Sequence, residues 1–338
     1  MKCGQSFLHL HMIYVELPDT EVRRLPFYLA MEEYLARNVA GETDLFFMWQ
    51  VDPTVIFGRN QIIDNEVNID YCRRNGIAMC RRKSGGGCVF ANRDNIMMSY
   101  ITANDQEVCT TFGRYTRMVT GMLRELGLDA SDTSRNDILI GDRKVSGNAF
   151  YHIPGHSIVH GTMLFDTDHT AMAEAITPPT VKMASKGVAS VRSRITTLKE
   201  HLTIGLEKFK QHARESLCNG TLHLTEADVA AIEEMERPYY DDEWVFRARR
   251  RKPTRWMRRI DGVGEFQVDV TTDENGLIQD LDLAGDFFLV GDLDTELTGR
   301  LKGVRHDRQS IAEALEGFDA GTVIYGMNNN QLTELLSN

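Results

Sequence analysis

The residues with the clearest chemical potential are three cations placed directly before three glycines. Residues 81–87 read Arg-Arg-Lys-Ser-Gly-Gly-Gly, and the apolar, strand-like segment Cys88-Val89-Phe90 follows them. Glycine permits positive φ angles and close approach of the backbone, so successive N–H groups can line a concave anion site. Arginine and lysine beside such a loop add charge-assisted hydrogen bonds to phosphate oxygens. The stretch predicts a phosphate-binding loop, and a flexible surface loop is the alternative for the glycines taken alone.

The order of these residues excludes the two common nucleotide-binding loops. A P-loop carries its lysine after the glycines and opens a helix, whereas Lys83 precedes them and a strand-like segment follows. A Rossmann loop requires GxGxxG at the start of a helix, a pattern that residues 81–90 do not have. A phosphate loop that leads into a strand suits an enzyme that reacts at the α-phosphate of ATP.

A second candidate, Lys144, lies in the run Asn-Asp-Ile-Leu-Ile-Gly-Asp-Arg-Lys-Val-Ser-Gly-Asn-Ala at residues 136–149. Joining a carboxylate to ATP brings two anions together, and a compact ammonium between them stabilises the pentavalent transition state. A single strand lysine is ordinarily a solvated surface charge, but the small residues Gly147 and Ala149 leave room for a ligand beside it. We therefore predict that Lys144 and the glycine loop face one cavity.

Helices and short strands must position these two segments. Apolar residues at helical spacing predict helices over residues 27–35 and 112–126. Gly-Asp between residues 137–140 and 143–151 predicts a hairpin with a tight turn, which places Lys144 on a strand. Further strands are predicted at residues 45–49, 54–57, 77–80, 95–101 and 157–165. Strands and helices without regular βαβ alternation favour the α+β class.

Composition limits the kind of protein. The 338 residues, 42% hydrophobic and 26% charged, suit a globular chain of two domains. The net charge of −11 argues against a nucleic-acid partner. No apolar run approaches the roughly 20 residues of a membrane span, and residues 1–11 resemble a loose extension more than a signal peptide. Six cysteines without a CxxC pair predict reduced thiols, a cytoplasmic location and no structural metal.

The composition shifts near residue 247, where a run rich in arginine begins. We predict a catalytic domain at residues 1–246, a basic linker at 247–259 and a small α+β accessory domain at 260–338, whose apolar residues alternate as in strands. The basic run is either a solvated linker or a docking site for an acidic partner.

Four motifs, in order, resemble those of lipoate–protein ligases. Residues 81–90 match RRxSGGGxV(F/Y), residues 141–149 match the lysine motif of that family, and residues 159–165 and 186–194 resemble its HHGTLLF and KGIxSVRSR segments. Residues 285–288 and 301–303 resemble its C-terminal accessory domain. The resemblance implies a mixed-sheet α+β catalytic domain like that of biotin and lipoate protein ligases.

The resemblance also implies a two-step reaction. Lipoate and MgATP give lipoyl-AMP and pyrophosphate, and a lysine of an acceptor lipoyl domain then forms an amide and releases AMP. The acceptors would be E2 subunits of 2-oxoacid dehydrogenases and the glycine cleavage H protein. Arg82 corresponds to the phosphate-binding arginine, with Arg81 assisting, and Lys144 to the lysine that touches the lipoyl carbonyl and the α-phosphate. The nucleotide would lie along Gly85, Gly86, Gly87, Cys88, Val89 and Phe90.

Three assignments have alternatives. Asp137 is a candidate Mg²⁺ ligand, since hard cations take carboxylate oxygens, or a structural residue of its strand. His160 is expected either to line the acyl pocket or to be a hydrogen-bonded core histidine. Trp49, together with Val55 and Phe57, would form an apolar wall for lipoate or part of the ordinary core.

Other sequence features bear on which reaction of this family the protein would catalyse. Related octanoyltransferases carry a catalytic cysteine just before the lysine motif, and residues 128–135 contain none, which favours an ATP-using ligase. Ala91-Asn92 stands where the family usually has His-Asp or Tyr-Asp. Two other functions remain: a lipoyl transferase that uses lipoyl-AMP or lipoylated protein without activating lipoate, and a non-catalytic lipoate-sensing protein.

Overall fold

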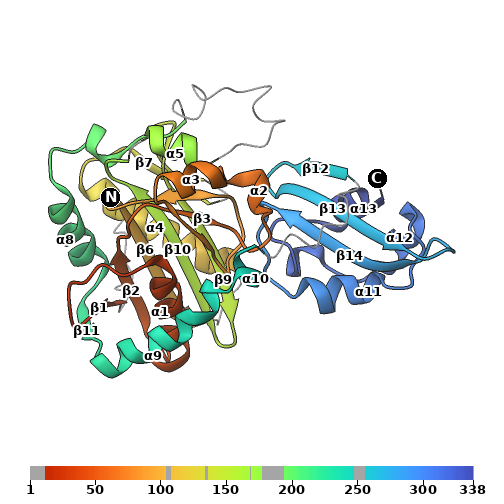
Figure 1. Cartoon of the computed structure of the whole chain (residues 1–338), viewed down its shortest axis with the longest axis horizontal. Helices are drawn as coiled ribbons and strands as arrows, with labels where there is room; N and C mark the ends of the chain where they lie inside the picture. The colour runs from red at the N-terminus through yellow and green to blue at the C-terminus, as the bar shows by residue number, and fades with distance from the viewer. Residues whose placement is uncertain are drawn as a thin grey trace, which may run out of the picture.

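The chain folds into two lobes, a larger one and a smaller one (Figure 1). The computed structural model describes residues 12–103, 108–133, 136–167, 169–176, 194–246 and 256–337. The larger lobe holds the elements up to α10 (Asp242–Val245), and the smaller lobe those from β12 (Trp256–Ile260) onward. The predictions for residues 1–11, for the motif at 186–193 and for the linker up to residue 255 concern positions outside the described residues.

An eight-stranded mixed sheet is the framework of the larger lobe and confirms the predicted α+β class. Its spatial order is β11-β1-β2-β6-β10-β9-β8-β7. Strand β1 pairs in parallel with β11 and β2, whereas the pairs from β2 to β7 are antiparallel. The strands are β1 Met12–Glu16, β2 Asp44–Trp49, β6 Asn95–Ala103, β7 Ala130–Asp132, β8 Asp137–Ile140, β9 Arg143–Ile153, β10 His156–Leu164 and β11 Gly220–His223.

Helices cover both faces of this sheet because its strands alternate apolar side chains between the faces. They are α1 Leu25–Asn38 and α9 Glu226–Glu236 on one face, and α4 Val108–Glu125 and α8 Leu206–Leu217 on the other. On β2, Leu45 and Phe47 join the core under α1 and α9, whereas Phe46 between them joins the core under α4 and α8. The larger lobe also contains two short 3₁₀ helices, η1 Leu198–Glu200 and η2 Arg237–Tyr240.

A second, three-stranded sheet carries the glycine loop. Its order is β4-β3-β5, with β3 at Thr54–Phe57, β4 at Ala78–Arg81 and β5 at Val89–Ala91. The loop of residues 82–88 therefore connects the two outer strands of this sheet. Around the sheet lie α2 Ile63–Glu66, α3 Ile69–Arg74 and α5 His169–Ala175.

The smaller lobe packs helices against an antiparallel sheet of order β12-β13-β14. Strand β12 begins at Trp256, so the described part of the predicted linker, residues 256–259, belongs to this sheet and corrects the predicted boundary. The other elements are β13 Gly264–Thr272, β14 Ile278–Gly285, η4 Leu293–Thr298, α11 Gly299–Leu301, α12 Arg308–Ala314, η5 Ala320–Thr322 and α13 Asn329–Ser337.

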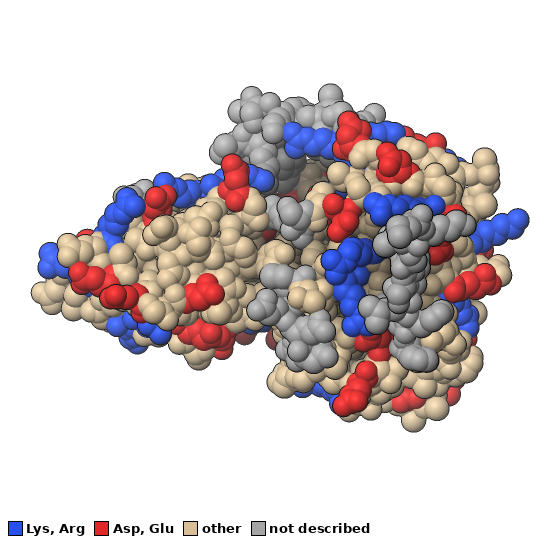
Figure 2. Space-filling view, turned by 180° about the vertical axis from the view of Figure 1, so that it is seen from behind, with Lys and Arg blue, Asp and Glu red and all other residues tan. Residues whose placement is uncertain are grey.

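The surface carries charges of both signs. Figure 2 shows acidic and basic side chains interspersed over both lobes on the face seen from behind. None of the described helices combines the length and apolar character needed to cross a membrane.

Candidate active site

The glycine loop is held in shape by the buried guanidinium of Arg82. Its Nη2 donates to the carbonyls of Gly85 at 2.6 Å and Gly87 at 2.7 Å, and its Nε donates to Ser84 Oγ at 2.9 Å. Burial lowers the pKa of Arg82 to about 10, so the side chain is still cationic at neutral pH. Arg82 thus fixes the loop and places positive charge directly behind its amides.

The loop amides are not equivalent. Gly86 has a φ of +85°, a conformation that other residues adopt only with strain, and its N–H donates to the carbonyl of Phe287 at 3.0 Å. The structure therefore assigns this N–H to the smaller lobe and not to an exposed anion site, contrary to the prediction for Gly86. Gly85 lies against the same carbonyl. Among the described residues, the N–H groups of Gly87 and Cys88 have no hydrogen-bond partner.

Lys144 comes from the neighbouring β8–β9 hairpin. The turn contains Gly141 with a φ of +60°, and the register shifts opposite Lys144, between Ile138 and Leu139. The shift leaves the Lys144 backbone to bond elsewhere: its N–H donates to Arg194 O at 2.8 Å, and its carbonyl accepts from Thr196 N–H at 2.9 Å. At Lys144, strand β9 is therefore held by β8 on one side and by residues 194–196 on the other.

The ammonium of Lys144 forms an ion pair with Asp137 across the hairpin, with Nζ 2.7 Å from Oδ1. It lies over Gly147, where an added Cβ would come within 2.7 Å of Nζ. The absence of a side chain at Gly147 is thus what allows Lys144 to adopt this position.

One small cavity of about 100 Å³ brings the two motifs together. Its polar wall is formed by Arg82, Lys144 and the loop from Gly86 to Cys88. Its apolar wall is formed by residues from the large and small sheets, helix α1 and the smaller lobe: Leu29, Trp49, Ile56, Val89, Met97 and Phe288. A cation, free amides and an apolar slot are the elements needed to bind a fatty-acid-like carboxylate beside a phosphate.

A chain of buried polar side chains runs behind this cavity. His160 lies with Nε2 2.7 Å from Ser84 Oγ and Nδ1 2.9 Å from a carboxylate oxygen of Glu32. Ser99 Oγ donates to Glu32 at 2.6 Å and accepts from the indole N–H of Trp49 at 2.9 Å. Since Arg82 already donates to Ser84, the Ser84 hydroxyl can donate to His160, whose other nitrogen then donates to Glu32. His160 is thus a buried histidine with both ring nitrogens hydrogen-bonded, and it also lines the cavity. That it contacts an acyl chain stays a prediction.

Arg81 lies elsewhere, which corrects the prediction that it assists phosphate binding. Its guanidinium donates to the backbone carbonyls of the 58–61 turn at 2.7–3.1 Å and to those of Trp244 and Val245 at 3.0–3.2 Å. It also stacks over Phe57, 4.7 Å from the ring centre. Arg81 is therefore a structural residue that connects the 58–61 turn to the segment at residues 244–245.

The alternation of side chains along strands accounts for other differences between the predicted and the observed lining of the cavity. Val55 and Phe57 belong to a separate core cluster and do not form the predicted apolar wall, whereas Trp49 lines the cavity, together with Ile56 and Val89. The Phe90 side chain belongs to the same separate cluster, and contact of its backbone with a nucleotide stays a prediction. Burial raises the pKa of the Cys88 thiol, so Cys88 is not a reactive nucleophile.

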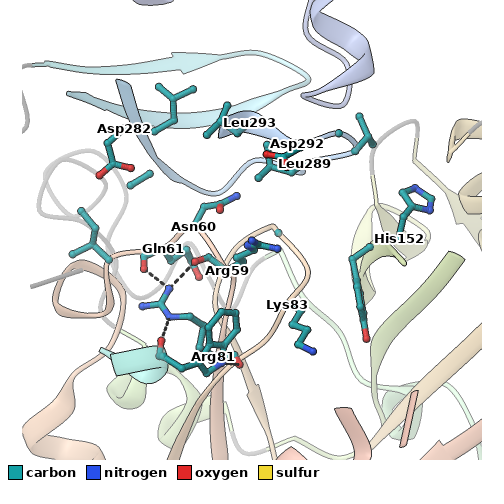
Figure 3. Close-up of a pocket in the computed structure, with 18 of the residues that line it drawn as sticks. Arg59, Asn60, Gln61, Arg81, Lys83, His152, Asp282, Leu289, Asp292 and Leu293 are labelled. Carbon is teal, nitrogen blue, oxygen red and sulfur yellow. Dashed lines mark hydrogen bonds between the residues drawn. The ribbon is translucent and has the colours of Figure 1, made fainter. Parts of the chain in front are cut away.

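A much larger cleft of about 1650 Å³ lies between the lobes (Figure 3), and Gly85 is among the residues that line it. Lys83 and Arg59 line it from the larger lobe, and Asp282 and Asp292 from the smaller one. Lys83 is paired with Glu33 and lies over Tyr239, so its charge is compensated.

No group of three or more His, Cys, Asp or Glu side chains suited to a metal occurs among the described residues. Mg²⁺ at nucleotide sites commonly takes only one or two carboxylates together with phosphates. Asp137, beside Lys144, fits that limited role and is the single carboxylate that the hairpin offers there.

Four important side chains were not predicted. Glu32, Ser84 and Ser99 form the buried polar chain, and Phe288 reaches the cavity from the smaller lobe. A sequence signal existed for Glu32, because the residues three positions before and after it in the predicted helix, Leu29 and Leu35, are apolar.

The mixed-sheet lobe, and the cavity shared by a glycine loop and a lysine, define an acyl-ligase catalytic domain. A family model described as the lipoyl protein ligase A/B catalytic domain matches residues 25–218, and one for the bacterial lipoate protein ligase C-terminus matches residues 255–336. The chain belongs to the lipoate–protein ligase family.

Individual proteins to which the chain is similar are also named lipoate–protein ligases. The chain is 32% identical to Lipoate–protein ligase 1 of Staphylococcus aureus over 91% of its length and 95% of that protein. It is 32% identical to the lipoate-protein ligase LplJ of Bacillus subtilis over 86% and 90%. A structure of P. falciparum LipL1 with lipoate shares the fold, with a TM-score of 0.74 at 19% identity, covering 96% of this chain and 98% of that one.

Proposed function

We propose that this protein activates lipoate with MgATP and transfers the lipoyl group to a lysine of acceptor lipoyl domains. The observation that carries the proposal is that Lys144, Arg82 and residues 86–88 of the glycine loop line one cavity together with apolar residues such as Trp49 and Met97. Relatives at 32% identity that are named lipoate–protein ligases, and that align over most of the chain, support it.

In the activation step the carboxylate of lipoate attacks the α-phosphorus of ATP, and pyrophosphate leaves. Lys144 would lie between the carboxylate and the α-phosphate, where its charge offsets the repulsion between two anions. The N–H groups of Gly87 and Cys88 would donate to phosphate oxygens, with the positive charge of Arg82 close to them. Mg²⁺, held by Asp137 and the phosphates, would supply further charge neutralisation.

The acyl chain would lie along the apolar wall. Each buried methylene contributes ~0.8 kcal/mol, so a narrow slot beside Trp49 and Met97 favours a straight-chain acid. In the transfer step the amine of the acceptor lysine attacks the lipoyl carbonyl, loses a proton and displaces AMP. E2 subunits and the glycine cleavage H protein are the acceptors we propose.

Lipoate-dependent release of pyrophosphate from MgATP by the purified protein tests this function. The expected result is release that requires lipoate, followed by a mass increase of an added lipoyl domain. Transfer from synthetic lipoyl-AMP without any pyrophosphate release would instead identify a transferase. Lipoate binding with neither reaction would identify a non-catalytic protein.

A further inference from the structure

One side chain of the reaction cavity comes from the smaller lobe. Phe288 follows β14, is 2% exposed, and lines the cavity together with Gly86, Lys144 and Ala149. Its ring stacks on Phe150 of β9, with the centroids 5.3 Å apart and the planes at 21°. Phe288 thus belongs to the core of the larger lobe, although its backbone belongs to the smaller one.

The neighbouring residue faces the opposite way and anchors this ring. Phe287 is fully buried in the core of the smaller lobe, where it stacks on Phe266 with centroids 4.6 Å apart. Its carbonyl accepts from Gly86 N–H, and the carbonyl of Phe288 accepts from Tyr325 N–H at 3.0 Å. The position of the Phe288 ring is therefore set by the folded smaller lobe.

The glycine loop is shaped to receive this segment. A Cβ on Gly85 would come within 2.3 Å of the Phe287 carbonyl oxygen, and one on Gly86 within 2.8 Å of the Phe288 ring. Two of the three glycines are thus required by the contact between the lobes. This requirement comes in addition to any phosphate binding by Gly87.

We propose that Phe288 is a substrate-binding residue that the accessory lobe supplies to the reaction site. Its ring lies against Gly86 and lines the cavity together with Lys144, where the proposed reaction joins the acyl carboxylate to the α-phosphate. An apolar ring at that place keeps water from a hydrolysable mixed anhydride and strengthens the electrostatic contacts of Lys144. The inference rests on the proposed function and names a residue and a role beyond it.

Kinetics of Phe288→Ala and Phe288→Leu in the full chain test the inference. For Phe288→Ala we expect the KM for lipoate in pyrophosphate release to rise about tenfold. We also expect synthetic lipoyl-AMP bound to the variant to lose its acyl group to water several-fold faster than in the wild type. Phe288→Leu, which keeps apolar volume at this position, should restore most of both properties. The matched control is Phe318→Ala, because this ring of the smaller lobe packs under Arg300 and does not line the cavity.

Other results would overturn the inference. A folded Phe288→Ala protein with unchanged KM and unchanged hydrolysis of lipoyl-AMP would show that the ring has no role in substrate binding. Faster turnover than the wild type would show that it obstructs the site. If Phe288→Ala does not fold, Phe288→Val takes its place as the shortened side chain, and wild-type values of both quantities in that variant count against the inference. A wild type that releases no pyrophosphate contradicts the proposed function alone, since hydrolysis of lipoyl-AMP still measures the ring's role.

Discussion

Lys144 Nζ lies 2.7 Å from Asp137 Oδ1, across the turn of the β8–β9 hairpin. Both side chains are about one-third exposed, 35% for Lys144 and 31% for Asp137, and Lys144 lines the cavity that the glycine loop also lines. A partly exposed ion pair of this kind contributes little to stability, about 0–1 kcal/mol. The ion pair does restrict where the Lys144 ammonium can lie in the absence of substrates.

Replacing Lys144 should abolish activation and spare the fold. We expect Lys144→Ala to lower the rate of lipoate-dependent pyrophosphate release by about 10²–10³-fold, the usual effect of removing one transition-state charge donor. The unfolding midpoint should change little, because the lost ion pair is partly exposed. Stopped-flow measurement of pyrophosphate, with circular dichroism as the folding control, checks this. Comparable turnover in the two proteins would remove Lys144 from the chemistry.

Asp137→Asn separates the two roles of this carboxylate. If Asp137 binds Mg²⁺, the Mg²⁺ concentration that gives half-maximal pyrophosphate release should rise about tenfold, because a charged oxygen ligand is lost. If it only positions Lys144, kcat should fall with an unchanged Mg²⁺ requirement. We expect the first result. Asp142→Asn, at the exposed hairpin turn, is the control.

Gly147→Ala should lower activity with little loss of stability. The new Cβ would lie 2.7 Å from Lys144 Nζ and 2.8 Å from its Cε, so the end of a flexible side chain must move. We expect kcat for activation to fall about tenfold and the thermal midpoint to stay within about 2 °C. Gly121→Ala in helix α4 meets no atom within 4 Å and is the control. Wild-type turnover in Gly147→Ala would mean that the position of Lys144 is not critical.

The buried carboxylate of Glu32 should contribute to the stability of the fold. Glu32 accepts from Ser99 and lies 2.9 Å from His160, with no exposed surface. Glu32→Gln keeps the shape but replaces one acceptor oxygen by a donor, and we expect a loss of about 2 kcal/mol in unfolding free energy. Urea denaturation measures it, and an unchanged midpoint would show that the polar chain is dispensable.

The ion pairs of Glu33 predict a specific pH dependence. Burial raises the pKa of Glu33, but hydrogen bonds and charges from Lys83 and Arg37 outweigh burial and hold it below the ordinary value of 4.5. These contacts therefore stabilise the fold above pH 4.5, and their contribution is lost as the pH falls through the folded-state pKa. The stability difference between wild type and Glu33→Gln should shrink as the pH is lowered below 4.5. A difference that stays constant from pH 7 to pH 3 would contradict this, and Glu42→Gln, at an exposed position, is the control.

Much of the architecture follows from local sequence. Short apolar runs predicted β2 and β3, the Gly-Asp turn predicted β9 and a helical pattern predicted α4, all near their observed bounds. The glycine triplet and Lys144 could also be identified from local sequence, because each lies in a short segment whose residue types suit anion binding.

Tertiary structure alone decided which neighbours serve the cavity. Arg81 and Arg82 are adjacent and chemically identical, yet successive residues at a strand end point to opposite sides, and only Arg82 lines the cavity formed with Lys144. Glu32 and Phe288 come from distant parts of the chain. They meet the glycine loop only because an eight-stranded sheet and the packing of a second lobe bring them there, and no local pattern encodes such contacts.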